Sequence, residues 1–158
     1  MNNFSAVRID DRLIHGQIVA TWISALGVNS IIVADTKAAN DALQKTLLKM
    51  AVPGSIKFEI LPFEEAAERF AGDSDMSKTL LIVRNIEGLK KLMDLGVGFT
   101  VVNFGNSGFA NGRVQYSKSV WLTPDERAVV EEVMAAGVTL EVRVVPSEAG
   151  NNMAQLLK

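Results

Sequence analysis

The chain has 158 residues, enough for one domain with a hydrophobic core, and we expect a single domain over residues 1–158. Its net charge of −2 and the lack of a basic run argue against nucleic-acid binding. With no cysteine and a single histidine, the sequence excludes disulfides, thiolate catalysis, and metal sites built from cysteines or several histidines. No apolar run approaches the length of a membrane span, and the first residues do not resemble a signal peptide, so we expect a cytoplasmic protein.

Short β-rich segments alternate with helical patterns along the whole chain. This alternation predicts an α/β fold: a doubly wound, mostly parallel sheet of about six or seven strands flanked by helices, with one antiparallel strand. The strands of the first half are expected at residues 4–9, 31–34, 56–61 and 79–83. Helices are expected at residues 18–26, ending near Gly27, at 40–50, capped by Asn40 or Asp41, and from Pro62 onward.

The second half continues the same alternation. Strands are expected at residues 99–103, 119–122 and 139–145, and helices at 86–95, 123–137 and 147–157. Gly96 suits the end of the first of these helices. Thr123 and Pro124 are the residue types that begin a helix, and Ser147 is expected to cap the last one. A glycine-rich loop occupies residues 104–113.

The single histidine, His15, lies where the first expected strand passes into the first expected helix, within the segment R-I-D-D-R-L-I-H-G-Q. In open α/β sheets, ligands bind beside the carboxyl ends of the strands. The amides of a helix N-terminus there favour an anion such as phosphate. This position favours a chemical role for His15 over the alternative of a buried structural histidine.

The residues beside the histidine fit a phosphohistidine. Arg12 carries a planar guanidinium that matches phosphate oxygens, and Asp10 or Asp11 can accept a hydrogen bond from the imidazole or from Arg12. An imidazole held in this way is a competent nucleophile. The backbone amides of Gly16 and Gln17 can then stabilise the bound phosphoryl group at the helix start.

The acidic residues have other interpretations. Asp10 and Asp11 can instead cap the following turn, or bind a hard cation such as Mg²⁺. No third acidic ligand has a fixed place, so we expect no metal and no other cofactor. Asp35 ends the second strand, which we expect to neighbour the first, and from there it can reach the histidine loop.

The histidine segment resembles the IIB subunit of the bacterial phosphoenolpyruvate:sugar phosphotransferase system, mannose/fructose/sorbose family. Further segments resemble that family in order over essentially the full length: A-A-N-D at 38–41, K-T-L-L-K-M-A-V-P at 45–53, V-N-F-G-N at 102–106, S-K-S-V at 117–120 and V-R-V-V-P at 142–146. The chain departs from the family at N-F-G-N-S-G, where N-V-G-G-M or N-V-G-N-M is common. Whether this loop lines the active site therefore stays open.

The resemblance implies a protein-phosphohistidine–sugar phosphotransferase. His15 would accept a phosphoryl group on Nδ1 from a IIA subunit and pass it to a sugar bound by the membrane subunits IIC and IID. Arg12 would neutralise the phosphoryl oxygens, Asp10 would orient the imidazole or Arg12, and Gly16 and Gln17 would donate amides. The protein would lie at the inner face of the membrane through IIC and IID. The sugar and the formation of a homo-oligomer stay open.

Two other functions are compatible with the pattern. A histidine-dependent phosphatase or mutase also attacks phosphate with a histidine, but generally needs a second histidine or an acid, and this chain has no second histidine. A non-catalytic nucleotide-binding module fits the doubly wound pattern. However, the sequence contains neither G-x-G-x-x-G after the first strand nor G-x-x-x-x-G-K-[ST].

Overall fold

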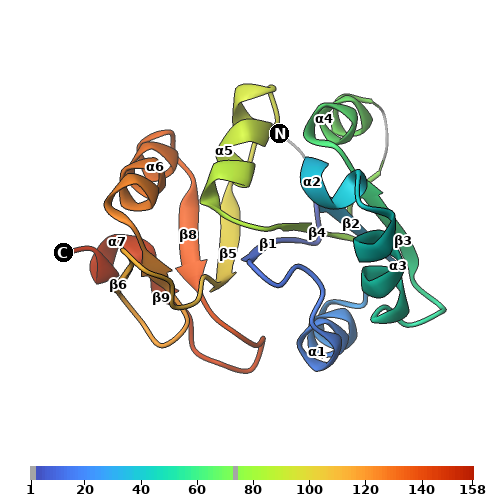
Figure 1. Ribbon diagram of the computed structural model, residues 1–158, viewed down its shortest axis with the longest axis horizontal. Coiled ribbons are helices and arrows are strands. Elements are labelled where there is room, and N and C mark those ends of the chain that lie inside the picture. Colours follow the sequence, from blue (N-terminus) through green and yellow to red (C-terminus); the bar gives the residue numbers. More distant parts are fainter. Residues whose placement is uncertain (1–2, 73–74) are drawn as a thin grey trace.

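The computed structural model describes residues 3–72 and 75–158 (Figure 1). The strands are β1 (Ala6–Asp10), β2 (Ser30–Ala34), β3 (Lys57–Leu61), β4 (Thr79–Val83), β5 (Val101–Asn106), β6 (Val114–Gln115), β7 (Trp121–Leu122), β8 (Thr139–Val142) and β9 (Asn151–Asn152). The helices are α1 (Gly16–Leu26), α2 (Thr36–Ala39), α3 (Ala42–Met50), α4 (Phe63–Ala71), α5 (Ile86–Asp94), α6 (Pro124–Ala135) and α7 (Met153–Leu156).

Seven of these strands form one sheet in the order β3-β2-β4-β1-β5-β8-β9. Every neighbouring pair in it is parallel except β8 and β9. This confirms the expected fold class, including its one antiparallel strand. Strand β1, which leads to the histidine, lies in the middle of the sheet between β4 and β5.

The helices cover both faces of the sheet, as Figure 1 shows with α1 on one side and α4 and α5 on the other. Apolar residues of α1, α2 and α3 pack on one face, and those of α4, α5, α6 and α7 pack on the opposite face. Strand β4 is buried along its whole length because it is covered on both sides. A continuous apolar run such as T-L-L-I-V is typical of such a central parallel strand. Within the described ranges, no helix is long and apolar enough to cross a membrane.

The ends of the helices follow local sequence signals. Helix α1 ends at Gly27, whose backbone is left-handed with a φ of 64° and whose N–H donates to the carbonyl of Ile23. Glycine adopts this conformation without a steric penalty, which confirms the expected end of the helix. Helix α6 begins with a capping box, in which Thr123 and Glu126 each accept from the other's backbone N–H.

The structure confirms the helix expected at residues 40–50 as α3, with Asp41 as its cap accepting from the Gln44 amide at 3.0 Å, and adds the short helix α2 before it. It corrects two other expectations about elements. Strand β7 pairs antiparallel with β6 outside the main sheet, because β5 already has β1 and β8 as its neighbours. The chain after β8 turns back as β9, so Asn152 caps α7 in place of Ser147.

Glu126 links the start of α6 to the preceding loop, and this pairing makes stability depend on pH. Its carboxylate accepts from Arg113 Nε at 2.9 Å, Arg113 Nη2 at 2.8 Å and the Thr123 amide at 2.7 Å. Burial by itself would raise the pKa of Glu126, but the hydrogen bonds from Arg113 and Thr123 outweigh it and hold the pKa below its ordinary value. The charged carboxylate therefore stabilises the fold above the unfolded-state pKa, and this stabilisation is lost as the pH falls through the lower, folded-state pKa.

Replacing this carboxylate by an amide tests that pH dependence. Glu126→Gln is expected to lower the free energy of unfolding at pH 7 by about 1–2 kcal/mol, since it removes hydrogen bonds to a charged group. The difference from wild type should shrink as the pH falls below the unfolded-state pKa, and it should disappear below the lower, folded-state pKa, where the folded wild-type carboxylate is protonated. Urea denaturation across pH measures both values, with the exposed Glu148→Gln as the matched control. An equal loss at pH 3 and pH 7 would contradict this assignment.

Candidate functional site

His15 lies at the N-cap of α1, directly after the loop that leaves β1. Its backbone is extended, with a φ of −124° and a ψ of 108°, and its side chain is exposed and makes no capping hydrogen bond. Its carbonyl accepts the first helical hydrogen bond, from the Val19 N–H at 2.9 Å. The imidazole therefore projects from a strand-to-helix loop, as the sequence predicts.

The first two residues of α1 are Gly16 and Gln17. The first N–H groups of an α-helix have no acceptor within the helix, and they carry its positive partial charge. A Cβ added at Gly16 would meet nothing within 4 Å, so a ligand can approach its backbone closely. These amides therefore have the position required for the predicted contact with an anion.

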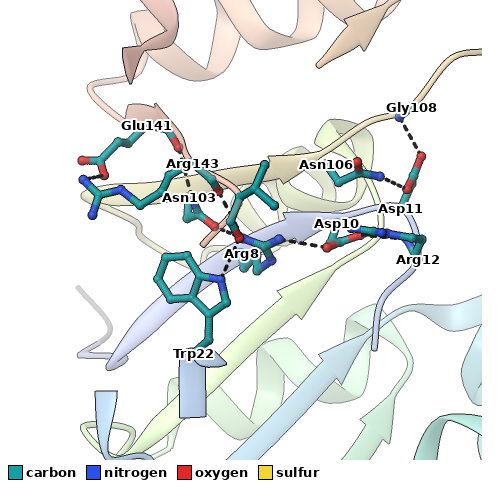
Figure 2. A network of polar contacts seen from close by, with 11 residues as sticks. Arg8, Asp10, Asp11, Arg12, Trp22, Asn103, Asn106, Gly108, Glu141 and Arg143 are labelled. Carbon is teal, nitrogen blue, oxygen red and sulfur yellow. Dashed lines mark hydrogen bonds and ion pairs between the residues drawn. The ribbon is translucent and has the colours of Figure 1, made fainter. Parts of the chain in front are cut away.

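Asp10 contacts two arginines from the end of β1. Its Oδ1 accepts from the backbone N–H of Arg12 at 3.0 Å and from Arg12 Nε at 3.3 Å, and its Oδ2 accepts from Arg8 Nη2 at 3.0 Å (Figure 2). Asp10 is 1% exposed, whereas the Arg12 side chain is 39% exposed. Of the two orienting contacts predicted for Asp10, the structure shows the one with Arg12. The bond to the Arg12 amide also closes a local turn, so the capping alternative applies here as well.

Asp11 contacts the long loop after β5. Its Oδ1 accepts from the Asn106 side-chain amide, and its Oδ2 accepts from the Gly108 N–H at 2.9 Å. The Asp11 backbone N–H donates in turn to the Asn106 carbonyl at 3.1 Å. The expected contact of Asp11 with the imidazole or Arg12 is replaced by these bonds. They place residues 106–108 beside the histidine loop.

Asp35 lies farther from the histidine loop than expected, because β4 is inserted between β2 and β1. The chain returns from β3 through α4 to fill that position, so β2 and β1 are not neighbours. The Asp35 carboxylate accepts from the Ala38 amide at 3.0 Å, which caps α2, and from Arg84 at 3.0 and 3.4 Å. Arg84 follows β4 directly. The pairing of Ile9 with Val83 places it next to Asp10 at the carboxyl edge of the sheet.

Arg8 is a site residue that the sequence reasoning missed. It is 2% exposed and donates to Asn103 Oδ1 at 2.6 Å and to the Arg143 carbonyl at 3.2 Å, in addition to Asp10. The register explains the first contact, because Arg8 and Asn103 are directly opposite each other on β1 and β5. Burial lowers the pKa of the Arg8 guanidinium below its ordinary value, and the neighbouring Asp10 opposes this shift. A charged residue inside an otherwise apolar strand is the signal that could have identified it, since buried charges require partners.

Gly105 makes room for this arginine. The pairing of β1 with β5 shifts between Ile9 and Asp10, which leaves Gly105 as an extra residue of β5. A Cβ added at Gly105 would overlap the guanidinium carbon of Arg8 and both of its terminal nitrogens. Only a residue without a side chain therefore fits against the buried guanidinium.

The site offers arginine side chains and backbone amides, which are groups that bind anions. In residues 3–72 and 75–158, no three histidine, aspartate or glutamate side chains come together as a metal site would require. The arrangement around His15 is instead an exposed imidazole with Arg12 and two helix amides nearby in the chain. These are groups that bind and stabilise a phosphoryl group.

Comparison with known proteins agrees with this chemistry. The family of the PTS system sorbose subfamily IIB component matches residues 4–158. The fructose-specific EIIB component of the Bacillus subtilis (strain 168) PTS is 34% identical over 159 residues, covering 100% of this chain and 98% of that protein. The mannose-specific EIIAB component of Escherichia coli (strain K12) is 30% identical over 155 residues, covering 95% of this chain but 47% of that protein.

The fold is similar to a solved IIB structure. The IIBSor domain of the sorbose permease from Klebsiella pneumoniae superposes with a TM-score of 0.90 at 28% identity, covering 98% of this chain and 96% of that one. The resemblance noted in the sequence is confirmed over nearly the whole length, by the family match and by the seven-stranded sheet. The chain belongs to the sorbose-subfamily IIB components of the sugar phosphotransferase system, which are phosphotransferases in sugar phosphorylation.

Proposed function

We propose that this protein is a phosphoryl carrier in which His15 accepts a phosphoryl group on Nδ1 from a phosphohistidine of a IIA subunit. It then passes the group to a hexose or amino sugar that enters the cell through the IIC and IID subunits. The observation that carries this proposal is the exposed imidazole of His15 at the N-cap of α1, three residues after Arg12. The family match favours this role over a phosphatase, a mutase or a nucleotide-binding module.

The transfer conserves the phosphoryl group and one proton at each step. In the first step, the P–N bond of the donor breaks while a P–N bond to His15 Nδ1 forms. The donor imidazole keeps the electron pair of the broken bond and takes up the proton that the His15 imidazole gives up. In the second step, the P–N bond of His15 breaks while a P–O bond to a sugar hydroxyl forms, and the His15 imidazole keeps the electron pair and takes up the hydroxyl proton. Such in-line transfer depends on positioning and on charge stabilisation more than on covalent help from the protein.

Each neighbouring residue has a role that its contacts support. Arg12 neutralises the phosphoryl oxygens, and Asp10 orients Arg12 through its Oδ1. The amides of Gly16 and Gln17 stabilise the same oxygens from the start of α1. Asp11 supports the site indirectly by holding residues 106–108 beside the loop.

The name and length of one relative support a IIA partner. The mannose-specific EIIAB component of Escherichia coli has a second part beyond the segment that this chain matches, and its name joins IIA to IIB. This supports a IIA subunit or domain as the donor here. The sugar acceptor is then reached at the inner face of the membrane, where the protein associates with IIC and IID.

A labelling experiment tests the carrier role. The wild-type protein is incubated with labelled phosphoenolpyruvate, the general phosphotransferase proteins and a IIA subunit that labels the fructose-specific EIIB component of Bacillus subtilis. We expect one phosphoryl group per chain, labile in acid and stable in base, and located on His15 Nδ1 by ³¹P and ¹⁵N NMR. An unlabelled chain beside a labelled control would overturn the proposal, and hydrolysis of small phosphate esters would be tested next.

A further inference from the structure

We propose that Arg8 is the positioning residue of the phosphoryl site. Its buried guanidinium fixes the orientation of the Arg12 side chain through Asp10, and it fixes the position of helix α1 through Trp22. His15 lies between these two groups in the chain. The proposal rests on the carrier function above, because it concerns how the groups that surround the phosphohistidine are held. Figure 2 shows Arg8 at the centre of the contacts involved.

The first link runs from Arg8 to Arg12 through one carboxylate. Arg8 Nη2 donates to Asp10 Oδ2 at 3.0 Å, while Asp10 Oδ1 accepts from the amide and the Nε of Arg12 at 3.0 and 3.3 Å. The two oxygens of Asp10 are thus divided between the two arginines. Because a carboxylate is planar, the direction in which Oδ1 points is set by the bond at Oδ2. A change at Arg8 therefore changes the orientation of Arg12.

The second link runs from Arg8 to α1. The guanidinium carbon of Arg8 lies 5.3 Å from the centre of the Trp22 ring, within the range of a cation–π contact. The Trp22 Nε1–H also donates to the Val144 carbonyl at 3.0 Å. Trp22 lies about two helical turns beyond His15. Its contact with Arg8 therefore helps to fix the position of α1 and the direction in which the first N–H groups of this helix point.

The guanidinium itself is held from the other side of the site. Arg8 Nη1 donates to Asn103 Oδ1 and to the Arg143 carbonyl, and the Asn103 amide donates to the same carbonyl at 2.9 Å. Gly105, which has no side chain, lets the backbone of β5 lie against the guanidinium, and any side chain at this position would displace it. At 2% exposure, Arg8 is enclosed by protein groups, so its effect on the reaction passes through other residues.

The test is a double-mutant cycle of Arg8→Lys with Arg12→Lys, measured as the rate at which His15 is phosphorylated by phospho-IIA. A lysine keeps the charge, but its single nitrogen cannot replace a planar fork that reaches Asp10, Asn103 and Arg143 together. Arg8→Lys is expected to lower the turnover rate about 10- to 100-fold with little change in the KM for phospho-IIA. The loss in the double variant should be far smaller than the product of the two single losses, because Arg8 acts through Arg12.

A second variant separates positioning from folding. Arg8→Met combined with Asp10→Asn removes both buried charges together, so no uncompensated charge is left in the interior. We expect this variant to unfold cooperatively on heating, yet to be phosphorylated slowly, because Arg12 is no longer oriented. Arg69→Lys is the matched control, since Arg69 on α4 forms a similar two-bond pair with Glu59 on β3, away from the histidine loop. Its phosphorylation rate should equal that of the wild type.

The outcomes distinguish this proposal from the carrier function. A wild-type chain that is not labelled on His15 overturns the carrier function before any Arg8 variant is compared. If the wild type is labelled and the Arg8→Lys variant is phosphorylated at the same rate, only the positioning role is overturned. The positioning role is also overturned if the losses from Arg8→Lys and Arg12→Lys multiply, or if the Arg8→Met, Asp10→Asn variant is phosphorylated at the wild-type rate.

Discussion

Replacing His15 by alanine is expected to reduce phosphoryl labelling of the protein to background while leaving it folded. His15 is the single histidine of the chain, so no other imidazole can take over the transfer. Its side chain is exposed and makes no capping hydrogen bond to α1, so its removal costs few contacts. We expect the free energy of unfolding to change by less than about 0.5 kcal/mol.

The measurement compares labelling and urea denaturation of the variant with those of the wild type. Ser24→Ala is the matched control, because Ser24 is exposed on the same helix and has no role in the proposal. It should be labelled at the wild-type rate. Label that persists on a folded His15→Ala protein would place the phosphoryl group on another residue type and end the phosphohistidine mechanism.

Replacing Gly105 by alanine is expected to lower the free energy of unfolding by about 3 kcal/mol, because it overpacks the site and displaces a buried charge from its partners. The added methyl group would overlap the Arg8 guanidinium at its carbon and at both terminal nitrogens. That guanidinium cannot move away freely, since it is bonded to Asp10, Asn103 and the Arg143 carbonyl. We therefore also expect slower phosphorylation of His15.

Urea denaturation checks this value against Gly54→Ala, a matched substitution with nothing within 4 Å of the added Cβ. That control should change stability by less than about 0.5 kcal/mol. In an Arg8→Lys background, Gly105→Ala should cost less, because lysine lacks the fork that the methyl group overlaps. If the Gly105→Ala protein is as stable as the Gly54→Ala protein, the result contradicts the close confinement of Arg8 that the structure shows.

Local sequence signals predicted the elements well. The fourth strand was expected at residues 79–83, and the structure shows β4 at Thr79–Val83. Thr123 and Pro124 marked the start of α6, and Gly27 marked the end of α1. These signals act between residues close together in the chain, so the sequence carries them directly. The loop that holds His15 could be located for the same reason.

The contacts inside the site could not be predicted in this way. Arg8 and Asn103 are 95 positions apart, and so are Asp11 and Asn106, so their pairing depends on β1 and β5 becoming neighbours. The position of β4 between β2 and β1 gave Asp35 a partner, Arg84, that its place in the sequence did not indicate.

By itself, the sequence determined the α/β class, most element bounds, the family, and the loop in which His15 follows Arg12 and Asp10. Only the tertiary structure decided the strand order, the use of Asp11 to hold residues 106–108, and the burial of Arg8 beneath Trp22. The physical reason is that hydrophobic periodicity and capping are local properties of the chain. A buried charge, in contrast, is satisfied by whichever strands pack beside it, and that depends on the whole sheet.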